Sequence, residues 1–126
     1  MKTNLRFSAF VLIVGAATMS RLAAAQEATE RYIPIGYSPG LSNEYNWIGE
    51  IAAVDRVSGT VTVRNERGDR TVRITDTTSI WIDRTAMQRA NTTGTMVDLI
   101  VGRRAEIKYV DYERREVAAW IKVAGN

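Results

Sequence analysis

The stretch IGEIAAVDRVSGTVTVRNERGDRTVRITDTTSI, from Ile48 to Ile80, decides the fold of this 126-residue chain. Apolar and polar side chains alternate along it, as around Val72 and Ile74, and a period of two is typical of a strand with one buried face. Turns fit at Ser58-Gly59 and at ERGD, residues 66–69, because Gly, Ser and Asp favour turn conformations. The stretch therefore predicts a meander of three antiparallel strands with one apolar face.

The chain that follows predicts a short helical connection and more strands. IWID, residues 80–83, continues the strand pattern. Residues 86–90 break it and predict one or two helical turns, which end within residues 91–94. The runs RRAEIKYVD, 103–111, and REVAAWIKV, 115–123, then predict a hairpin across the charged turn DYERR.

This order of elements predicts an all-β fold over residues 47–126. Three strands, a short helical connection and two further strands follow one another as in a five-stranded OB-type barrel. We therefore expect a small five- to six-stranded OB-like barrel, whose closure would remove exposed sheet edges. A six-stranded open barrel or a small sandwich is the alternative, because order along the chain does not determine closure.

The N-terminus has the pattern of a secretory signal peptide. Lys2 and Arg6 precede an apolar run over residues 7–19, and Ala23 and Ala25 provide the small side chains of a cleavage site. The run is shorter than the roughly 20 residues that span a bilayer. We therefore expect a signal peptide over residues 1–25, no membrane span in the mature chain, and a periplasmic or secreted protein. A retained membrane anchor is the alternative.

Composition removes several classes of function. Residues 1–25 hold three of the 17 Lys and Arg residues and no acid, so the cleaved chain would have 14 basic and 14 acidic residues. A formal charge of zero gives no support for nucleic-acid binding through phosphate neutralisation. The chain has no His and no Cys, which excludes imidazole-based catalysis, the usual zinc ligands and disulfides.

The segment RYIPIGYSPGLSNEYNW, residues 31–47, is unusual for a linker. It contains both prolines and three of the five tyrosines of the chain, together with several aliphatic side chains. We interpret residues 26–31 as a flexible leader and residues 32–46 as an ordered strap, which packs on the outer surface of the barrel near Trp81 or Trp120. A free binding loop is the alternative.

Trp81 and Trp120 are the candidate ligand-binding residues. If their aliphatic neighbours face the interior, both indoles face outward, and OB-type barrels bind oligonucleotides and sugars with such aromatics. The candidate site consists of these two tryptophans and the cations Arg73, Arg84 and Lys122. The alternative is that the strap covers both indoles, since leaving them in water would forgo about 3–6 kcal/mol of burial.

The carboxylates predict neither catalysis nor metal binding. Four aspartates fall at predicted turns or caps, where Asp bonds to the nearby backbone. They are Asp55, Asp76, Asp98 and Asp111. Glu50 and Glu106 fall on the polar side of alternating strands, and DYERRE, residues 111–116, is interpreted as a solvated hairpin end. We therefore expect no catalytic residue, no metal site and no cofactor.

Three runs resemble a family of small exported bacterial OB-like β-barrel domains of unknown function. They are residues 48–80, VDLIVGRRAEIKYVD at 97–111 and VAAWIKV at 117–123. The shared pattern includes a Gly-x-Ile opening, a Gly-Thr-Val-Thr-Val second strand and Asp-Leu-x-x-Gly before the fourth strand. Arg103 stands where such sequences often have an acid. The resemblance implies a barrel fold and an envelope location, and it implies no activity.

Two classes of function remain open from the sequence. The first is a non-catalytic interaction module that binds another protein of the cell envelope through its surface or its strap. The second is a module that binds glycans or oligomers on its outer-face aromatics. Burial of both indoles would favour the first class, and their exposure beside arginines would favour the second.

Overall fold

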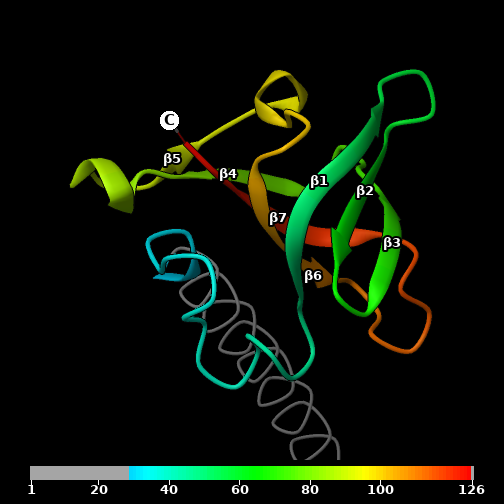
Figure 1. Ribbon diagram of the computed structural model, residues 1–126, viewed down its shortest axis with the longest axis horizontal. Helices are drawn as coiled ribbons and strands as arrows, with labels where there is room; N and C mark the ends of the chain where they lie inside the picture. The colour runs from blue at the N-terminus through cyan, green and yellow to red at the C-terminus, as the bar shows by residue number, and fades with distance from the viewer. Residues whose placement is uncertain (1–28, 126) are drawn as a thin grey trace, which may run out of the picture. The chain divides into compact units, whose positions relative to one another are not determined.

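The structure is a computed structural model that describes residues 29–125 (Figure 1). The chain divides into two units, and the second, which begins at Arg31, contains all the strands and 3-10 turns. The predicted signal peptide, residues 1–25, and residues 26–28 of the predicted leader lie outside the described residues.

The described chain has a mostly β fold with two short 3-10 turns and no long helix. The elements in chain order are β1 (Trp47–Asp55), β2 (Thr60–Asn65), β3 (Gly68–Arg73), β4 (Ser79–Asp83), η1 (Thr85–Met87), β5 (Thr92–Thr93), η2 (Met96–Asp98), β6 (Arg104–Tyr109) and β7 (Ala118–Ala124). The predicted meander of β1, β2 and β3 is confirmed by their antiparallel pairing. The predicted closing hairpin is confirmed by the pairing of β6 with β7.

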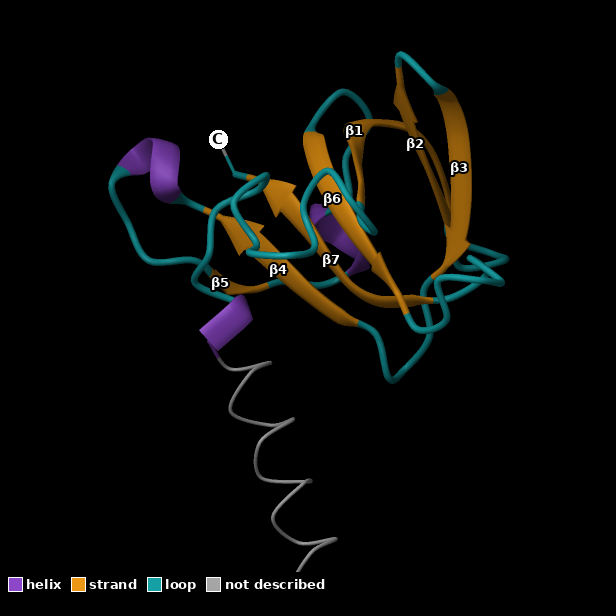
Figure 2. Ribbon diagram, turned by 90° about the horizontal axis from the view of Figure 1, so that it is seen from below, coloured by secondary structure: helices purple, strands orange, loops and turns teal. Residues whose placement is uncertain are grey.

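The seven strands of residues 29–125 form one sheet in the order β3-β2-β1-β6-β7-β4-β5 (Figures 1 and 2). Neighbouring strands are antiparallel, except that β4 and β7 run parallel. The sheet is not closed, and β3 and β5 are its edge strands. One isolated parallel bridge joins Arg73, at the end of β3, to Val117, just before β7.

One face of the sheet forms the hydrophobic core. Val61 and Val63 of β2, Ile107 of β6, and Ile121 and Val123 of β7 are fully buried in a single cluster. On β2 and on β7 the paired residues are two apart, which is the spacing that places side chains on the same face. The alternation in the sequence therefore predicts the core face correctly.

The connection between β4 and β6 differs from the prediction. The helical turns expected at residues 86–90 are a single 3-10 turn at Thr85–Met87, which ends because Gln88 adopts a left-handed φ of 56°. Residues 91–94, expected to form only a loop, contain β5, which pairs with β4. The β-branched pair Thr92–Thr93 suits an edge strand. The described chain therefore has seven strands where five or six were expected.

Gly49 allows β1 to pair with two different strands. The first half of β1 pairs with β6, and the second half pairs with β2. A Cβ on Gly49 would lie 2.2 Å from the Arg64 carbonyl oxygen, which is far inside van der Waals contact. Asn65 fixes this close approach, because its Nδ2 donates a hydrogen bond to the Ile48 carbonyl oxygen at 2.7 Å.

Gly49→Ala is expected to lower the free energy of unfolding by roughly 1–3 kcal/mol, since the new methyl group must push β1 away from β2. Chemical denaturation of the two proteins measures the difference. Ala53→Val adds methyl groups at an exposed position of the same strand and serves as the control. Equal effects of the two substitutions would contradict this explanation of Gly49.

Candidate functional site

Two stacked tryptophans occupy the outer face of β4 and β7. Trp81 and Trp120 lie opposite the core face, since Ile80 and Ile121 beside them belong to the core cluster. Their ring centroids are 5.5 Å apart, and only 5% of Trp81 and 3% of Trp120 is exposed. Both indoles therefore face outward, and neither offers a stacking surface to a ligand.

The strap, residues 32–46, is hydrogen-bonded to this outer face through Glu106 of β6. The Gly36 N–H donates to Glu106 Oε1 at 2.8 Å. Ser42 Oγ and Asn46 Nδ2 donate to Glu106 Oε2 at 2.7 and 2.8 Å. Glu106 lies opposite the core face, as predicted, since its neighbours Ala105 and Ile107 belong to the core cluster, and it is fully buried there. The strap covers it.

Lys122 of β7 is a second buried charge under the strap. Its Nζ donates to Ser38 Oγ at 3.2 Å and lies 4.5 Å from the centroid of the Trp120 ring. The β6–β7 register places Lys122 directly opposite Glu106. A buried ammonium group is stable only with compensating partners, and the aromatic ring, the serine hydroxyl and the charge of Asp83 provide them.

Asp83, at the end of β4, binds the beginning of the strap. It accepts hydrogen bonds from the Ile35 N–H at 2.9 Å and from the Thr85 N–H and hydroxyl at 2.9 and 2.6 Å. Burial alone would raise the pKa of Asp83. The hydrogen bonds from Thr85 and Ile35 and the charge of Lys122 outweigh burial, and the pKa lies below its usual value of 3.8.

The five predicted site residues do not form one open site. Trp81, Trp120 and Lys122 come together on the outer face, where they are buried. Arg73 is exposed at the end of β3, and Arg84 is half-buried after β4. Ligand binding by these residues stays a prediction, and in this structure three of the five are closed to solvent.

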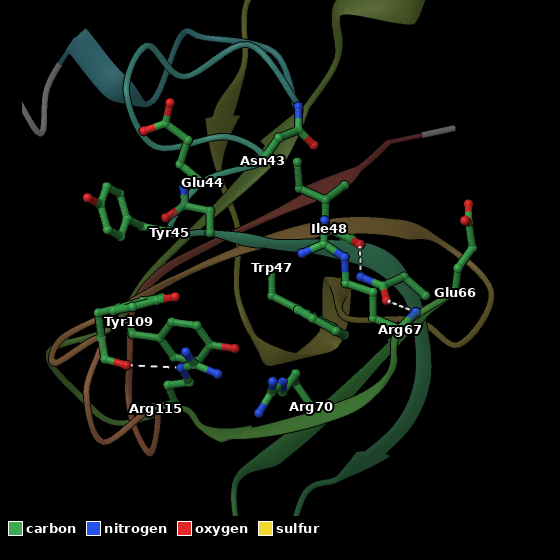
Figure 3. Close-up of a pocket in the computed structure, with 13 residues that line it drawn as sticks. Asn43, Glu44, Tyr45, Trp47, Ile48, Glu66, Arg67, Arg70, Tyr109 and Arg115 are labelled. Atoms are coloured by element: carbon green, nitrogen blue, oxygen red, sulfur yellow. Dashed lines mark hydrogen bonds between the residues drawn. The ribbon is translucent and has the colours of Figure 1, made fainter.

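A pocket of about 500 Å³ opens where the end of the strap meets the sheet. Its walls come from the strap, the start of β1, the β2–β3 turn, β3, and the connection from β6 to β7. The lining residues are Asn43, Glu44, Tyr45, Asn46, Trp47, Ile48, Asn65, Glu66, Arg67, Arg70, Tyr109, Tyr112 and Arg115. Figure 3 shows Asn43, Glu44 and Tyr45 on one side of the pocket, and Arg70 and Arg115 on the other.

Arg70 and Arg115 are held in the pocket by aromatic rings. The guanidinium of Arg70 lies 5.0 Å from the centroid of Trp47, and that of Arg115 lies 4.5 Å from the centroid of Tyr112. Arg115 Nε also donates to the Tyr112 carbonyl oxygen at 3.0 Å. Within residues 29–125 neither arginine forms an ion pair. These contacts restrain both guanidinium groups, and they leave most of the N–H groups without a hydrogen bond to the described residues.

The backbone of Arg115 adopts a left-handed φ of 58°. Such a conformation is uncommon for residues other than glycine, and it persists only where the surroundings impose it. Here it turns the arginine back toward Tyr112 at the rim of the pocket.

Two buried polar atoms of the pocket residues have no hydrogen-bond partner among the described residues. They are Tyr109 Oη and Asn46 Oδ1. The Tyr109 side chain is only 7% exposed, and burial raises its pKa above 10.0 against the opposing charges of Arg70 and Arg115. Buried polar groups are nearly always satisfied, so both atoms call for a partner, and because each has less than 1 Å² of accessible surface a ligand reaches them only when neighbouring pocket side chains move.

Sequence reasoning missed this pocket. The run DYERRE is a solvated hairpin end only in part: Asp111 pairs with Arg114 at 3.8 Å, but Arg115 lines the pocket. The lining residues come from separate segments of the chain, and only folding brings those segments together. Two runs carried a signal of the pocket. YVDYERR, residues 109–115, combines tyrosines with arginines, and the turn RNERGDR, residues 64–70, is rich in arginine.

In residues 29–125, no helix is long and apolar enough to cross a membrane. The same part of the chain contains no group of three or more His, Cys, Asp or Glu side chains arranged to hold a metal ion. Comparison of the sequence and structure with family models, curated proteins and solved structures gave no match. Any function assigned to this chain therefore rests on the geometry of the strap and the pocket.

Glu106→Ala is expected to lower the free energy of unfolding by about 3 kcal/mol, because three donors of the strap lose their acceptor. The strap should also open, which chymotrypsin cleavage after Tyr37 would detect. Glu50→Ala, at an exposed carboxylate of β1, is the control. If both variants resist cleavage equally well, Glu106 does not anchor the strap.

Asp83 is expected to make the protein less stable in acid. Its pKa is lowered in the folded state, so its contribution is fully present above about pH 4 and is lost as the pH falls below that value. Denaturation of the wild type and Asp83→Asn, at neutral pH and near pH 3, measures this contribution. The difference between the two proteins should shrink in acid, and a constant difference would contradict the assignment.

Proposed function

We propose that this protein is a non-catalytic interaction module that binds an acidic ligand in the pocket between the strap, the β2–β3 turn and the β6–β7 connection. One observation carries the proposal. Two arginines without an acidic partner and a buried hydroxyl without a hydrogen-bond partner line a single pocket of the described chain. Arginine is suited to such a site because its planar fork matches the geometry of oxyanions.

The burial of Trp81 and Trp120 supports an interaction module over a module that stacks glycans on these indoles. A stacking site needs open ring faces, and the two indoles are nearly closed to solvent. The pocket, in contrast, has exposed aromatic surface, since 51% of Tyr45 and 37% of Tyr112 is exposed. An envelope protein or an acidic glycan would each supply a ligand of the proposed charge.

The proposal also includes an OB-like barrel fold and an exported location. An OB-like barrel is supported by the chain order and by the Arg73–Val117 bridge, which brings the end of β3 close to the start of β7. Export to the periplasm or the medium is supported by the signal-peptide pattern of residues 1–25 and by the resemblance to exported barrel domains. Neither point is needed for ligand binding at the pocket.

The non-catalytic character rests on how the buried carboxylates are used. Asp83 and Glu106 each accept three hydrogen bonds. A carboxylate whose lone pairs are occupied in this way holds structure together and is poorly placed to transfer a proton. The absence of His and Cys from the sequence removes imidazole as a base and a thiol as a nucleophile.

Binding of 3-phenylpropionate, a small aromatic acid, tests the proposal. Titration should change the tryptophan fluorescence in a saturable way, because Trp47 lies beside Arg70. Arg70→Gln should weaken binding about tenfold, as expected for the loss of a charged hydrogen bond. Calorimetry should give the same affinities.

Arg89→Gln is the matched control for this experiment, because Arg89 is exposed and does not line the pocket. It should bind 3-phenylpropionate as the wild type does. The proposal fails if the wild type shows no saturable binding up to about 10 mM, or if the two arginine variants bind equally well.

A further inference from the structure

The charges of the pocket favour a ligand with a single negative charge. Three arginines, Arg67, Arg70 and Arg115, and two acids, Glu44 and Glu66, line it, which leaves one net positive charge. A carboxylate matches this excess, whereas a phosphate dianion would exceed it. Arg70 and Arg115 lie on the side away from the strap (Figure 3), so the carboxylate belongs there.

The Tyr109 hydroxyl adds a neutral donor on the same side. Its ring belongs to the core cluster, so the position of the oxygen is fixed. Because burial raises its pKa, the hydroxyl keeps its proton at neutral pH and can donate it. Arg70, Arg115 and Tyr109 together form a cradle of two charged donors and one neutral donor, which is a suitable set for the two oxygens of a carboxylate.

Asn46 supplies the opposite kind of group. Its Nδ2 donates to Glu106, which fixes the amide so that Oδ1 remains as an acceptor without a partner. A ligand that satisfies this atom must bring an N–H or O–H donor. A ligand that reaches both buried atoms would therefore meet donors for its acid group on one side and an acceptor from the strap on the other.

We infer that the pocket binds an N-acylated α-amino acid, either as a free molecule or as the C-terminal residue of a peptide. Such a ligand carries a carboxylate for Arg70, Arg115 and Tyr109, and an amide N–H next to it for Asn46 Oδ1. Its side chain would lie against the edge-to-face pair of Tyr45 and Tyr112, whose centroids are 5.1 Å apart. This inference rests on the proposed function and narrows its ligand.

Three matched ligands test the inference on the mature protein. N-Acetylphenylalanine has the carboxylate, the N–H and the ring. N-Acetylphenylalaninamide lacks the carboxylate, and 3-phenylpropionate lacks the N–H. N-Acetylphenylalanine is expected to bind at least tenfold more tightly than either, because each of the others leaves buried polar atoms unpaired. Equal binding of N-acetylphenylalanine and 3-phenylpropionate would overturn the inference while leaving the proposed function standing.

Variants separate the roles of the pocket residues. Tyr109→Phe removes only the unpartnered oxygen, so it should weaken binding of N-acetylphenylalanine several-fold without lowering the thermal stability of the protein. Arg89→Gln should leave binding unchanged. If Tyr109→Phe binds N-acetylphenylalanine as the wild type does, the hydroxyl does not contact the ligand and the inference fails.

A five-residue peptide that ends in phenylalanine distinguishes the two sources of the ligand. Tighter binding of the peptide than of N-acetylphenylalanine indicates a protein C-terminus, and tighter binding of N-acetylphenylalanine indicates a small molecule. Both outcomes support the inference, provided that amidation of the C-terminus abolishes peptide binding. If the amidated peptide binds as well as the free acid, or if no ligand of the set binds, the inference is wrong.

Discussion

The carboxylate of Glu106 is the group on which the rest of the structure depends. It lies on an outer face that also carries two indoles and an ammonium group, and it draws three donors of one short segment onto that face. One of these donors belongs to Asn46, which also lines the pocket. The same carboxylate therefore holds the strap on the outer face of the sheet and sets one wall of the candidate ligand site.

Polar contacts hold the strap more than apolar ones do. Its aromatic residues suggested a hydrophobic cover, but Tyr32 and Tyr37 are largely exposed, and Ile35 is the hydrophobic side chain of the strap that is fully buried. Hydrogen bonds to buried charges depend strongly on geometry, so they fix the strap in one register. An apolar cover of the same size would permit sliding, and the wall of the pocket would then be poorly defined.

The fold could be predicted from the sequence much further than the pocket. Period-two alternation gives the strands and their faces, and it correctly places Trp81 and Trp120 opposite the core. It does not reveal whether an outer face is exposed to water or covered, so the burial of Glu106 could not be read from its place on the polar side of the strand. The pocket depends on Tyr109, Arg70 and Asn46 meeting from distant segments, and the left-handed backbone of Arg115 has no signal in the residue type.

The hydrogen bonds from the strap to Glu106 span 60 to 70 residues of sequence, and the bond between Ser38 and Lys122 spans 84. The partners of the strap lie on three different strands, since Asp83 belongs to β4, Glu106 to β6 and Lys122 to β7, so its docking surface exists only after these strands have paired. The sheet must therefore assemble before the strap can dock. Until then Glu106 and Lys122 lack their hydrogen bonds from the strap, and the sheet leaves two charged groups of its outer face without these partners.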